Sequence, residues 1–166
     1  MQKFRIYFFF FLSVFILSCE KHIPKKSLLA LGDNYTVGEG SLENQSWPNQ
    51  LKDSLANFNI FISRPTIVAK SGWTTNELKI GIDNASLNYP YDWVSILIGF
   101  NNHYKGGNII DFKEQFEIIL SEAIAFSGNI KENVLVISIP DWGITPFAQG
   151  RNRKKIEKEI DNFNQI

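Results

Sequence analysis

Four short apolar runs, separated by stretches with helical character, are the feature that most constrains the fold of this chain. They cover residues 27–31, 66–69, 93–98 and 133–139. Runs without polar alternation are typical of strands that are buried on both faces of a parallel sheet. Strands that alternate with helices form such a sheet through crossover connections. We therefore expect an α/β fold, built as a three-layer α/β/α sandwich.

The segments between these runs contain the helix signals that this architecture requires. Helices are expected over residues 46–56, over 112–128 and from 151 onward. Another helix should begin at Thr74, which forms a capping box with Glu77. The economical arrangement of these elements is a flavodoxin-like parallel sheet covered by helices on both faces.

Three of the apolar runs are each followed by a short segment that contains glycine and polar residues. These segments are Leu31-Gly32-Asp33-Asn34-Tyr35, Ser71-Gly72-Trp73 and Ile98-Gly99-Phe100-Asn101-Asn102. The carboxyl ends of parallel strands meet at one edge of a sheet, and ligands bind there in open α/β sheets. We therefore expect the three segments to form one site.

Together with Ile139-Pro140-Asp141-Trp142-Gly143, these segments resemble the SGNH (GDSL-type) hydrolases, and the resemblance extends from about Leu28 to Ile166. The family is defined by a nucleophilic Ser, a Gly and an Asn of the oxyanion hole, and a catalytic His. The resemblance implies the fold of that family and an ancestry among esterases that act on carboxylic ester bonds of lipids or glycans. It also implies that Gly72 and Asn101 are oxyanion-hole residues.

The chain departs from the family pattern at two of the four defining positions. Asn34 stands where the family has its nucleophilic Ser. The block Asp-x-x-His, which supplies the His, would lie beyond Ile166. A carboxamide has no usable nucleophilic atom near neutral pH. We therefore expect this chain to be catalytically silent, either as a binding protein for an acyl ester or acetylated glycan or as a truncated fragment of an esterase.

Each site residue also has a simpler interpretation. Asn34 suits a turn, Gly72 suits a tight strand-to-helix connection and Asn101 can cap a loop. Asp33 is expected to brace its turn and Trp73 to contribute to a ligand pocket. His103 is the one candidate for a general base near the motifs, although a single loop His is more commonly a solvated surface residue.

The same resemblance predicts an exposed sheet edge. The family places a fifth strand after the last helix, and this chain ends before reaching it, so the domain is expected to be C-terminally incomplete. The fourth apolar run, 133–139, would then form a hydrophobic edge. Such edges invite pairing with another chain, which predicts self-association.

The amino terminus has the pattern of a targeting segment. Lys3 and Arg5 precede an apolar stretch, Ile6 to Leu17, that is too short to span a bilayer. The sequence Ile16-Leu17-Ser18-Cys19 resembles a bacterial lipoprotein signal, in which cleavage leaves a lipid on Cys19. An ordinary secretory signal or an anchor helix with an incidental Cys is the alternative.

The lipoprotein interpretation divides the chain into three parts. Residues 1–18 would be the signal peptide, 19–26 a polar tether and 27–166 the hydrolase-like domain. Lipidated Cys19 would then attach the protein to a membrane of the bacterial cell envelope, facing the periplasm or the cell exterior.

Charge and composition argue against several other functions for this chain. Seventeen basic residues balance 17 acidic ones, and removal of Lys3 and Arg5 leaves 15 against 17, a mature charge of about −2. The densest basic cluster, Arg151 to Lys158, also contains Glu157 and is expected to be a solvated helix face. Nucleic acid is therefore not an expected partner. No metal-ligand spacing or phosphate loop occurs, so no metal or cofactor is expected.

Overall fold

Four parallel strands form the centre of the structure. A computed structural model describes residues 24–166, so the predicted signal peptide and Cys19 lie outside the described residues. Neighbouring strands pair in parallel, in the order β2-β1-β3-β4. The strands are β1 (Leu28–Gly32), β2 (Thr66–Ala69), β3 (Trp93–Leu97) and β4 (Val134–Val136). This arrangement confirms the predicted α/β fold with a parallel sheet.

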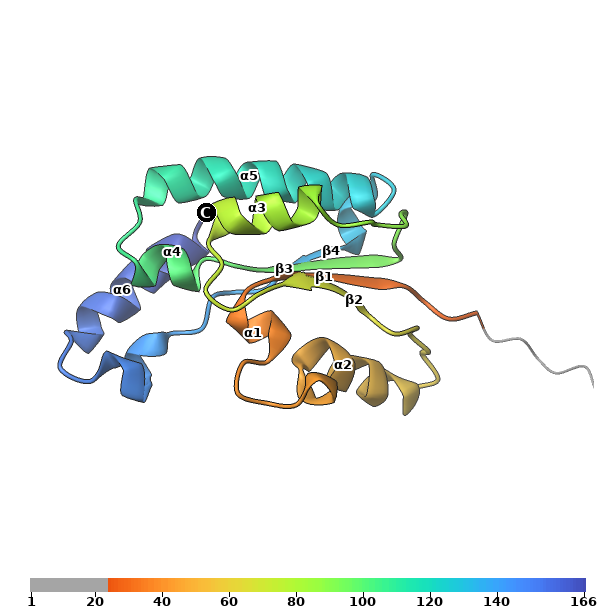
Figure 1. Ribbon diagram of the computed structural model, residues 1–166, viewed down its shortest axis with the longest axis horizontal. Helices are drawn as coiled ribbons and strands as arrows, with labels where there is room; N and C mark the ends of the chain where they lie inside the picture. Colours follow the sequence, from red (N-terminus) through yellow and green to blue (C-terminus); the bar gives the residue numbers. More distant parts are fainter. Residues whose placement is uncertain (1–23) are drawn as a thin grey trace, which may run out of the picture.

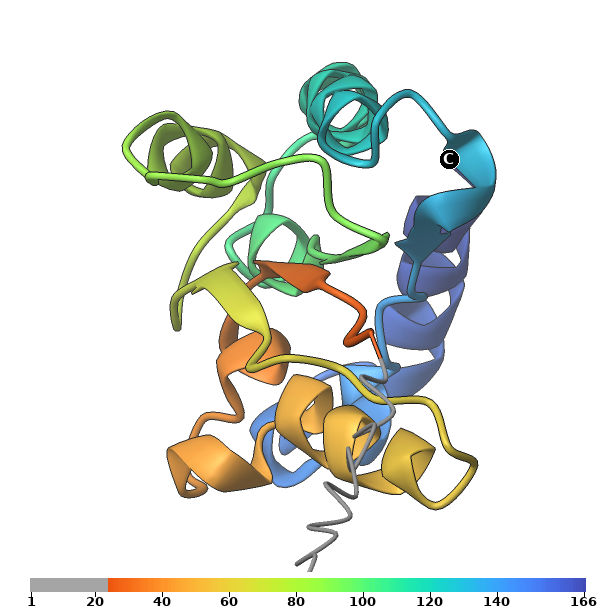
Figure 2. The ribbon, with the colours of Figure 1, turned by 90° about the vertical axis from the view of Figure 1, so that its right-hand side faces the viewer.

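Helices cover both faces of the sheet and its carboxyl end (Figures 1 and 2). Helices α3 (Thr75–Asp83) and α5 (Ile109–Phe126) lie on one face, and α1 (Asn34–Val37) and α2 (Trp47–Ala56) lie on the other. Helices α4 (Phe100–Tyr104) and α6 (Arg153–Asn164) lie toward the carboxyl end of the strands. Between residues 24 and 166, none of the helices has the length and apolar character needed to cross a bilayer.

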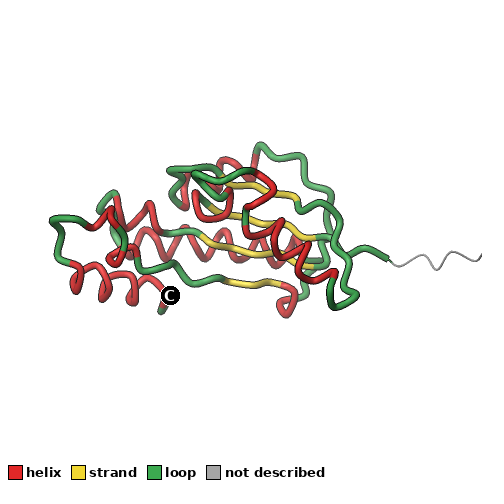
Figure 3. The backbone as a smooth tube through the Cα atoms, turned by 90° about the horizontal axis from the view of Figure 1, so that it is seen from below, coloured by secondary structure: helices red, strands yellow, loops and turns green. Residues whose placement is uncertain are grey.

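Short 3-10 turns complete the connections between these elements. They are η1 (Glu43–Gln45), η2 (Lys131–Asn133), η3 (Trp142–Ile144) and η4 (Pro146–Ala148). The turns η3 and η4 belong to the long connection between β4 and α6, which Figure 3 shows as a loop at the end of the molecule away from the start of the described chain.

The central strand β1 has the most completely buried sequence. All five of its residues are buried, since β1 has a strand on each side and helices above and below. Burying a Leu side chain contributes roughly 1.5–3 kcal/mol relative to exposure. Phe112, Phe116, Ile119 and Ala123 of α5 are buried as predicted from their helical spacing. The continuous apolar run is therefore the element around which the layers assemble.

The predicted start of α3 is confirmed, whereas the predicted end of the last strand is wrong. The predicted capping box is present, because the Thr74 N–H donates to Glu77 Oε2 at 2.7 Å. Strand β4 is shorter than the predicted 133–139. Beyond it the Ile137 N–H still donates to the Ile96 C=O of β3 (2.9 Å), whereas Ile139 bonds to α6. There the side-chain amide of Asn164 accepts from the Ile139 N–H (2.8 Å) and donates to the Ile139 C=O (3.0 Å).

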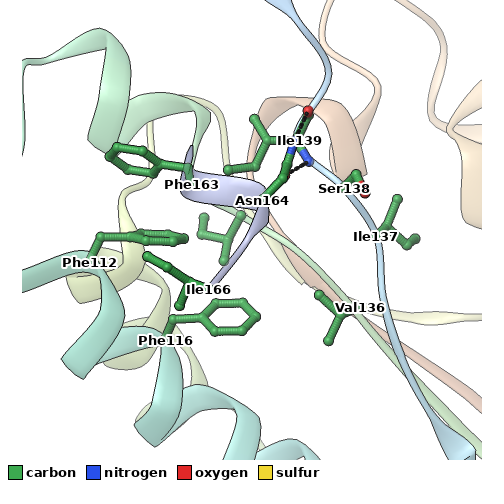
Figure 4. Close-up of a pocket in the computed structure, with 10 residues that line it drawn as sticks. Phe112, Phe116, Val136, Ile137, Ser138, Ile139, Phe163, Asn164 and Ile166 are labelled. Carbon is green, nitrogen blue, oxygen red and sulfur yellow. Dashed lines mark hydrogen bonds between the residues drawn. The ribbon is translucent and has the colours of Figure 1, made fainter. Parts of the chain in front are cut away.

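The outer edge of β4 is open along the part of the chain that the structure describes. No strand of residues 24–166 pairs with it, and Leu135 and Val136 are 50% and 54% exposed. Beside this edge lies a groove of about 60 Å³ between α5 and α6, which Figure 4 shows with its aromatic side chains. An exposed apolar edge is therefore present, while self-association through it stays a prediction.

Substituting a charged residue at this edge tests that prediction. We expect the wild-type chain to self-associate with rising concentration, and Leu135→Lys to weaken association by about tenfold, because an edge Lys opposes strand pairing. Sedimentation velocity over a concentration series measures this. Ile118→Lys, at a similarly exposed position on α5, is the matched control. A wild-type chain that stays monomeric throughout the series would contradict the prediction.

Candidate functional site

The three glycine-containing segments meet around one oxygen atom. Asn34 follows β1, Gly72 follows β2 and Asn101 follows β3. The Asn34 Oδ1 atom accepts a hydrogen bond from Asn101 Nδ2 at 2.8 Å and a longer one from the Gly72 N–H at 3.4 Å. Residues far apart in the sequence thus place two hydrogen-bond donors at a single point beyond the carboxyl end of the sheet.

The turn after β1 positions Asp33 and Asn34. A side chain at Gly32 would place a Cβ atom 2.1 Å from Thr36 Oγ1 and 2.5 Å from the Leu97 C=O oxygen, so only glycine fits there. Asp33 then begins α1, because its Oδ1 atom accepts from the Tyr35 N–H at 3.1 Å. This N-cap directs Asn34 toward the ends of the neighbouring strands.

The Asn101 side chain is the hub of the site. Its Nδ2 atom donates to Asn34 Oδ1 at 2.8 Å, to the Trp73 C=O at 2.9 Å and, at 3.4 Å, to Asp33 Oδ2. Asn101 is buried in the first turn of α4, so these contacts are shielded from water. Gly72 has φ = +85°, a conformation that other residues rarely adopt, and this orients its N–H toward Asn34.

Burial of the site perturbs its titratable groups. Asp33 is completely buried, and this burial raises its pKa to about 6, although the hydrogen bonds from the Tyr35 N–H and the Asn101 amide act in the opposite direction. Burial also raises the pKa of Tyr35, with smaller contributions from the Asp33 and Asp141 carboxylates. Asp33 is therefore a buried carboxyl held inside the turn by these hydrogen bonds.

A cavity of about 540 Å³ opens beside Asn34 and Asn101. Three aromatic rings form one wall. Tyr35 packs edge to face against Phe100, with ring centroids 5.4 Å apart, and Phe100 stacks on Tyr104 at 5.6 Å. The complete lining is Asn34, Tyr35, Glu39, Gly40, Phe100, Asn101, Tyr104, Thr145 and Phe147. The cavity is thus largely apolar, with a few polar atoms at its walls.

The membership of the site differs from the expected one at several positions. The indole ring of Trp73 packs against the backbone of α3 at Gly81, where an added Cβ would lie 2.2 Å from the ring, and only the Trp73 C=O reaches the site. Thr145 and Phe147, which were not expected at the site, line the cavity from the β4–α6 connection. No periodic pattern surrounds these two residues, so nothing in the sequence pointed to them.

His103 does not face the cavity. Its Nδ1 atom accepts from the Trp142 indole N–H at 3.0 Å, which places the proton on Nε2, and Nε2 donates to Glu159 Oε2 at 3.0 Å. The side chain is only 8% exposed. Both ring nitrogens are therefore occupied, and His103 joins α4 to η3 and α6 rather than to the Asn34 site.

Metal ligands are not gathered near this site. Within residues 24–166, no three His, Cys, Asp or Glu side chains lie close enough together to hold a metal ion. The chemistry available at the site is therefore that of amide and backbone donors, buried Asp33 and aromatic rings.

Comparison with protein families identifies a match over nearly all of the described chain. A model of the GDSL-like lipase/acylhydrolase family matches residues 30–166, which include the end of β1, the other three strands and the Asn34 site. A search of curated proteins finds no match.

Solved structures with the same fold include several esterases. A mutant of the esterase AlinE4 has 22% sequence identity and a TM-score of 0.61, covering 84% of this chain and 69% of the other. A lipase/acylhydrolase from Enterococcus faecalis has 20% identity and a TM-score of 0.64, with the same two coverages. The esterase EstA from Pseudoalteromonas sp., inhibited by monoethylphosphonate, has 17% identity and a TM-score of 0.58, covering 82% and 74%. At these identities the likeness establishes the fold.

The buried carboxyl of Asp33 predicts a specific dependence of stability on pH. Its pKa rises from 3.8 in the unfolded chain to about 6 in the folded one, so its unfavourable contribution is absent below pH 3.8, grows as the pH rises and is complete above about 6. At 1.36 kcal/mol per pKa unit this amounts to roughly 3 kcal/mol. The stability of Asp33→Asn relative to wild type should therefore increase by about that amount between acidic and neutral pH.

Urea unfolding of both proteins across this pH range measures the difference. Asp53→Asn, which removes an exposed carboxylate, controls for the loss of a charge on the surface. Stability curves of wild type and Asp33→Asn that run parallel would show that burial of Asp33 has no such cost.

Proposed function

We propose that this chain, which belongs to the GDSL-like lipase/acylhydrolase family, binds a ligand in its aromatic cavity without hydrolysing esters. One observation carries the proposal. The residue at the nucleophile position, Asn34, has a carboxamide whose oxygen accepts from both Asn101 and Gly72.

Ester hydrolysis by this kind of site needs an attacking atom and donors for the developing oxyanion. Asn34 supplies no attacking atom, because the nitrogen lone pair is delocalised into its carbonyl. The two donors that converge beyond the sheet already bind Asn34 Oδ1, at 2.8 Å and 3.4 Å. An ester carbonyl would have to displace the Asn34 oxygen from these donors. Position 34 therefore supplies no attacking atom and also occupies the Asn101 and Gly72 donors.

No histidine of the described residues is placed to act as a base at position 34. His103 is the one histidine among residues 24–166, and Trp142 and Glu159 bond both of its ring nitrogens. Moving the ring toward the cavity would break both bonds and remove it from contact with Trp142 and Phe163. Restoring a hydroxyl at position 34 therefore does not by itself restore the chemistry.

The cavity supports the binding half of the proposal. Its volume of about 540 Å³ lies within the range of small-molecule sites. The rings of Tyr35, Phe100, Tyr104 and Phe147 provide apolar surface for an acyl chain or the face of a sugar. Esterases among the structural neighbours favour an acyl ester, and an acetylated glycan would present the same acyl group.

The expected result with p-nitrophenyl butyrate is binding without turnover. Release of p-nitrophenol by the wild-type chain should equal that of heat-denatured protein. Hydrolases without their triad still react roughly a thousandfold faster than water alone. Even this residual acceleration should be absent here, since Asn34 occupies the donors. Absorbance measures turnover, and calorimetry with butyrate esters of a non-chromogenic alcohol measures binding.

Three variants make this test specific. Asn34→Ser should remain silent, because His103, the one histidine of residues 24–166, bonds Trp142 and Glu159 instead of facing position 34. Phe147→Ala should weaken binding by about tenfold through loss of aromatic contact. Phe58→Ala, equally exposed but remote from the cavity, should bind as wild type does. Turnover by the wild-type chain, or covalent labelling of residue 34 by a fluorophosphonate probe, would overturn the proposal.

We further propose that the protein is a lipid-anchored component of the bacterial cell envelope, held by Cys19. The support is the sequence Ile16-Leu17-Ser18-Cys19 after a short apolar stretch. Mass spectrometry of the chain purified from bacterial membranes should find Cys19 as the first residue, carrying acyl chains. Cys19→Ser should lose this modification, and an unmodified mature chain that begins at another residue would contradict the anchor.

A further inference from the structure

The connection between β4 and α6 ends in a concentration of positive charge. Residues 142–156 contain four cations and no Asp or Glu, and all four cations are exposed. Among the described residues only Lys155 of this group has an ion pair, with Glu159 at 3.7 Å. We call this set, together with two apolar side chains, the basic tip: Ile144, Phe147, Arg151, Arg153, Lys154 and Lys155.

These cations oppose the electrostatics of their own helix. Arg153, Lys154 and Lys155 occupy the first turn of α6, where the helix dipole favours negative charge, and that turn contains no acidic residue. Glu157 and Glu159 come only in the following turn. Arg153 and Lys154 have no ion pair among the described residues, and a local arrangement that costs stability in this way is expected where the charges serve an external contact.

Two large apolar side chains lie directly before the cations. Ile144 is 77% exposed and Phe147 is 72% exposed. The connection is held in place, because the Arg151 guanidinium lies over the rings of Tyr104 (4.7 Å) and Trp142 (5.2 Å). Exposed apolar and cationic side chains thus follow closely on one another along an anchored segment.

We propose that the basic tip docks on a bilayer surface that contains anionic lipids. The cations would face the lipid phosphates, while Ile144 and Phe147 enter the headgroup region. A soluble polyanion would satisfy the charges but leave both apolar side chains in water, which favours the bilayer. Phe147 also lines the cavity, so docking brings the mouth of the cavity close to the lipid surface.

The position of the tip determines which surface it can reach. The connection and the start of α6 lie at one end of the longest axis, and the described chain begins at the other (Figure 1). A predicted tether of eight residues, 19–26, extends at most about 28 Å. A chain held in one membrane by its amino-terminal segment, with its long axis upright on that membrane, would present the tip to a second, opposing surface.

Vesicle capture tests this inference on the full chain. The chain is first incorporated into neutral phosphatidylcholine vesicles, and flotation shows whether its amino-terminal segment holds it there. Fluorescent vesicles rich in phosphatidylglycerol are then added, and their capture is measured. We expect capture of the anionic vesicles but not of neutral ones, with a decrease at high salt. If flotation fails, the anchor proposal fails separately, and the chain is coupled to the neutral surface through its single cysteine, Cys19.

Paired variants distinguish a bilayer from a soluble anionic polymer. Arg153→Glu with Lys154→Glu should reduce capture by about tenfold, and Ile144→Ser with Phe147→Ser by a similar factor. Lys113→Glu with Lys131→Glu makes the same change in charge on exposed positions outside the tip and should leave capture intact. Equal losses in the tip and control charge variants, or equal capture of neutral vesicles, would overturn the inference. Loss with the charge variant alone would assign the tip to a soluble anionic polymer and overturn the bilayer.

Discussion

The hydrogen bond from Asn101 Nδ2 to Asn34 Oδ1, 2.8 Å long, is the contact around which the site is organised. It joins the segment that follows β1 to the segment that follows β3, and the Gly72 N–H adds the segment that follows β2. Because the three strands are parallel neighbours, their carboxyl ends necessarily lie together. The same bond satisfies the buried Asn101 amide.

Asp33 illustrates how a site of this kind depends on stability supplied elsewhere. A completely buried carboxyl with a pKa near 6 is unfavourable at neutral pH, and it remains in place because its oxygens cap α1 and receive the Asn101 amide. The apolar run of β1 and the aromatic face of α5 supply the compensating burial. The hydrophobic layers therefore hold the polar turn in a conformation that it would not keep alone.

Much of the fold could be predicted because its signals are local. The apolar runs indicated parallel strands, Thr74 with Glu77 indicated the start of α3, and the spacing of Phe112, Phe116 and Ile119 indicated the buried face of α5. The end of β4 could not be predicted in the same way. Residues 137–139 continue the run with an Ile on each side of Ser138, but the side chain of Asn164, 25 positions after Ile139, bonds to Ile139 there.

The sequence by itself determined that position 34 carries a carboxamide and indicated that Gly72 and Asn101 each follow a strand, since these depend on covalent identity and local pattern. Only the tertiary structure decided that the Asn34 oxygen lies between those two donors, that the ring of Trp73 packs on Gly81 and that His103 bonds Trp142 and Glu159. It also decided that Thr145 and Phe147 complete the cavity. The reason is physical: side-chain direction follows from packing between distant segments, and no local pattern in the chain encodes it.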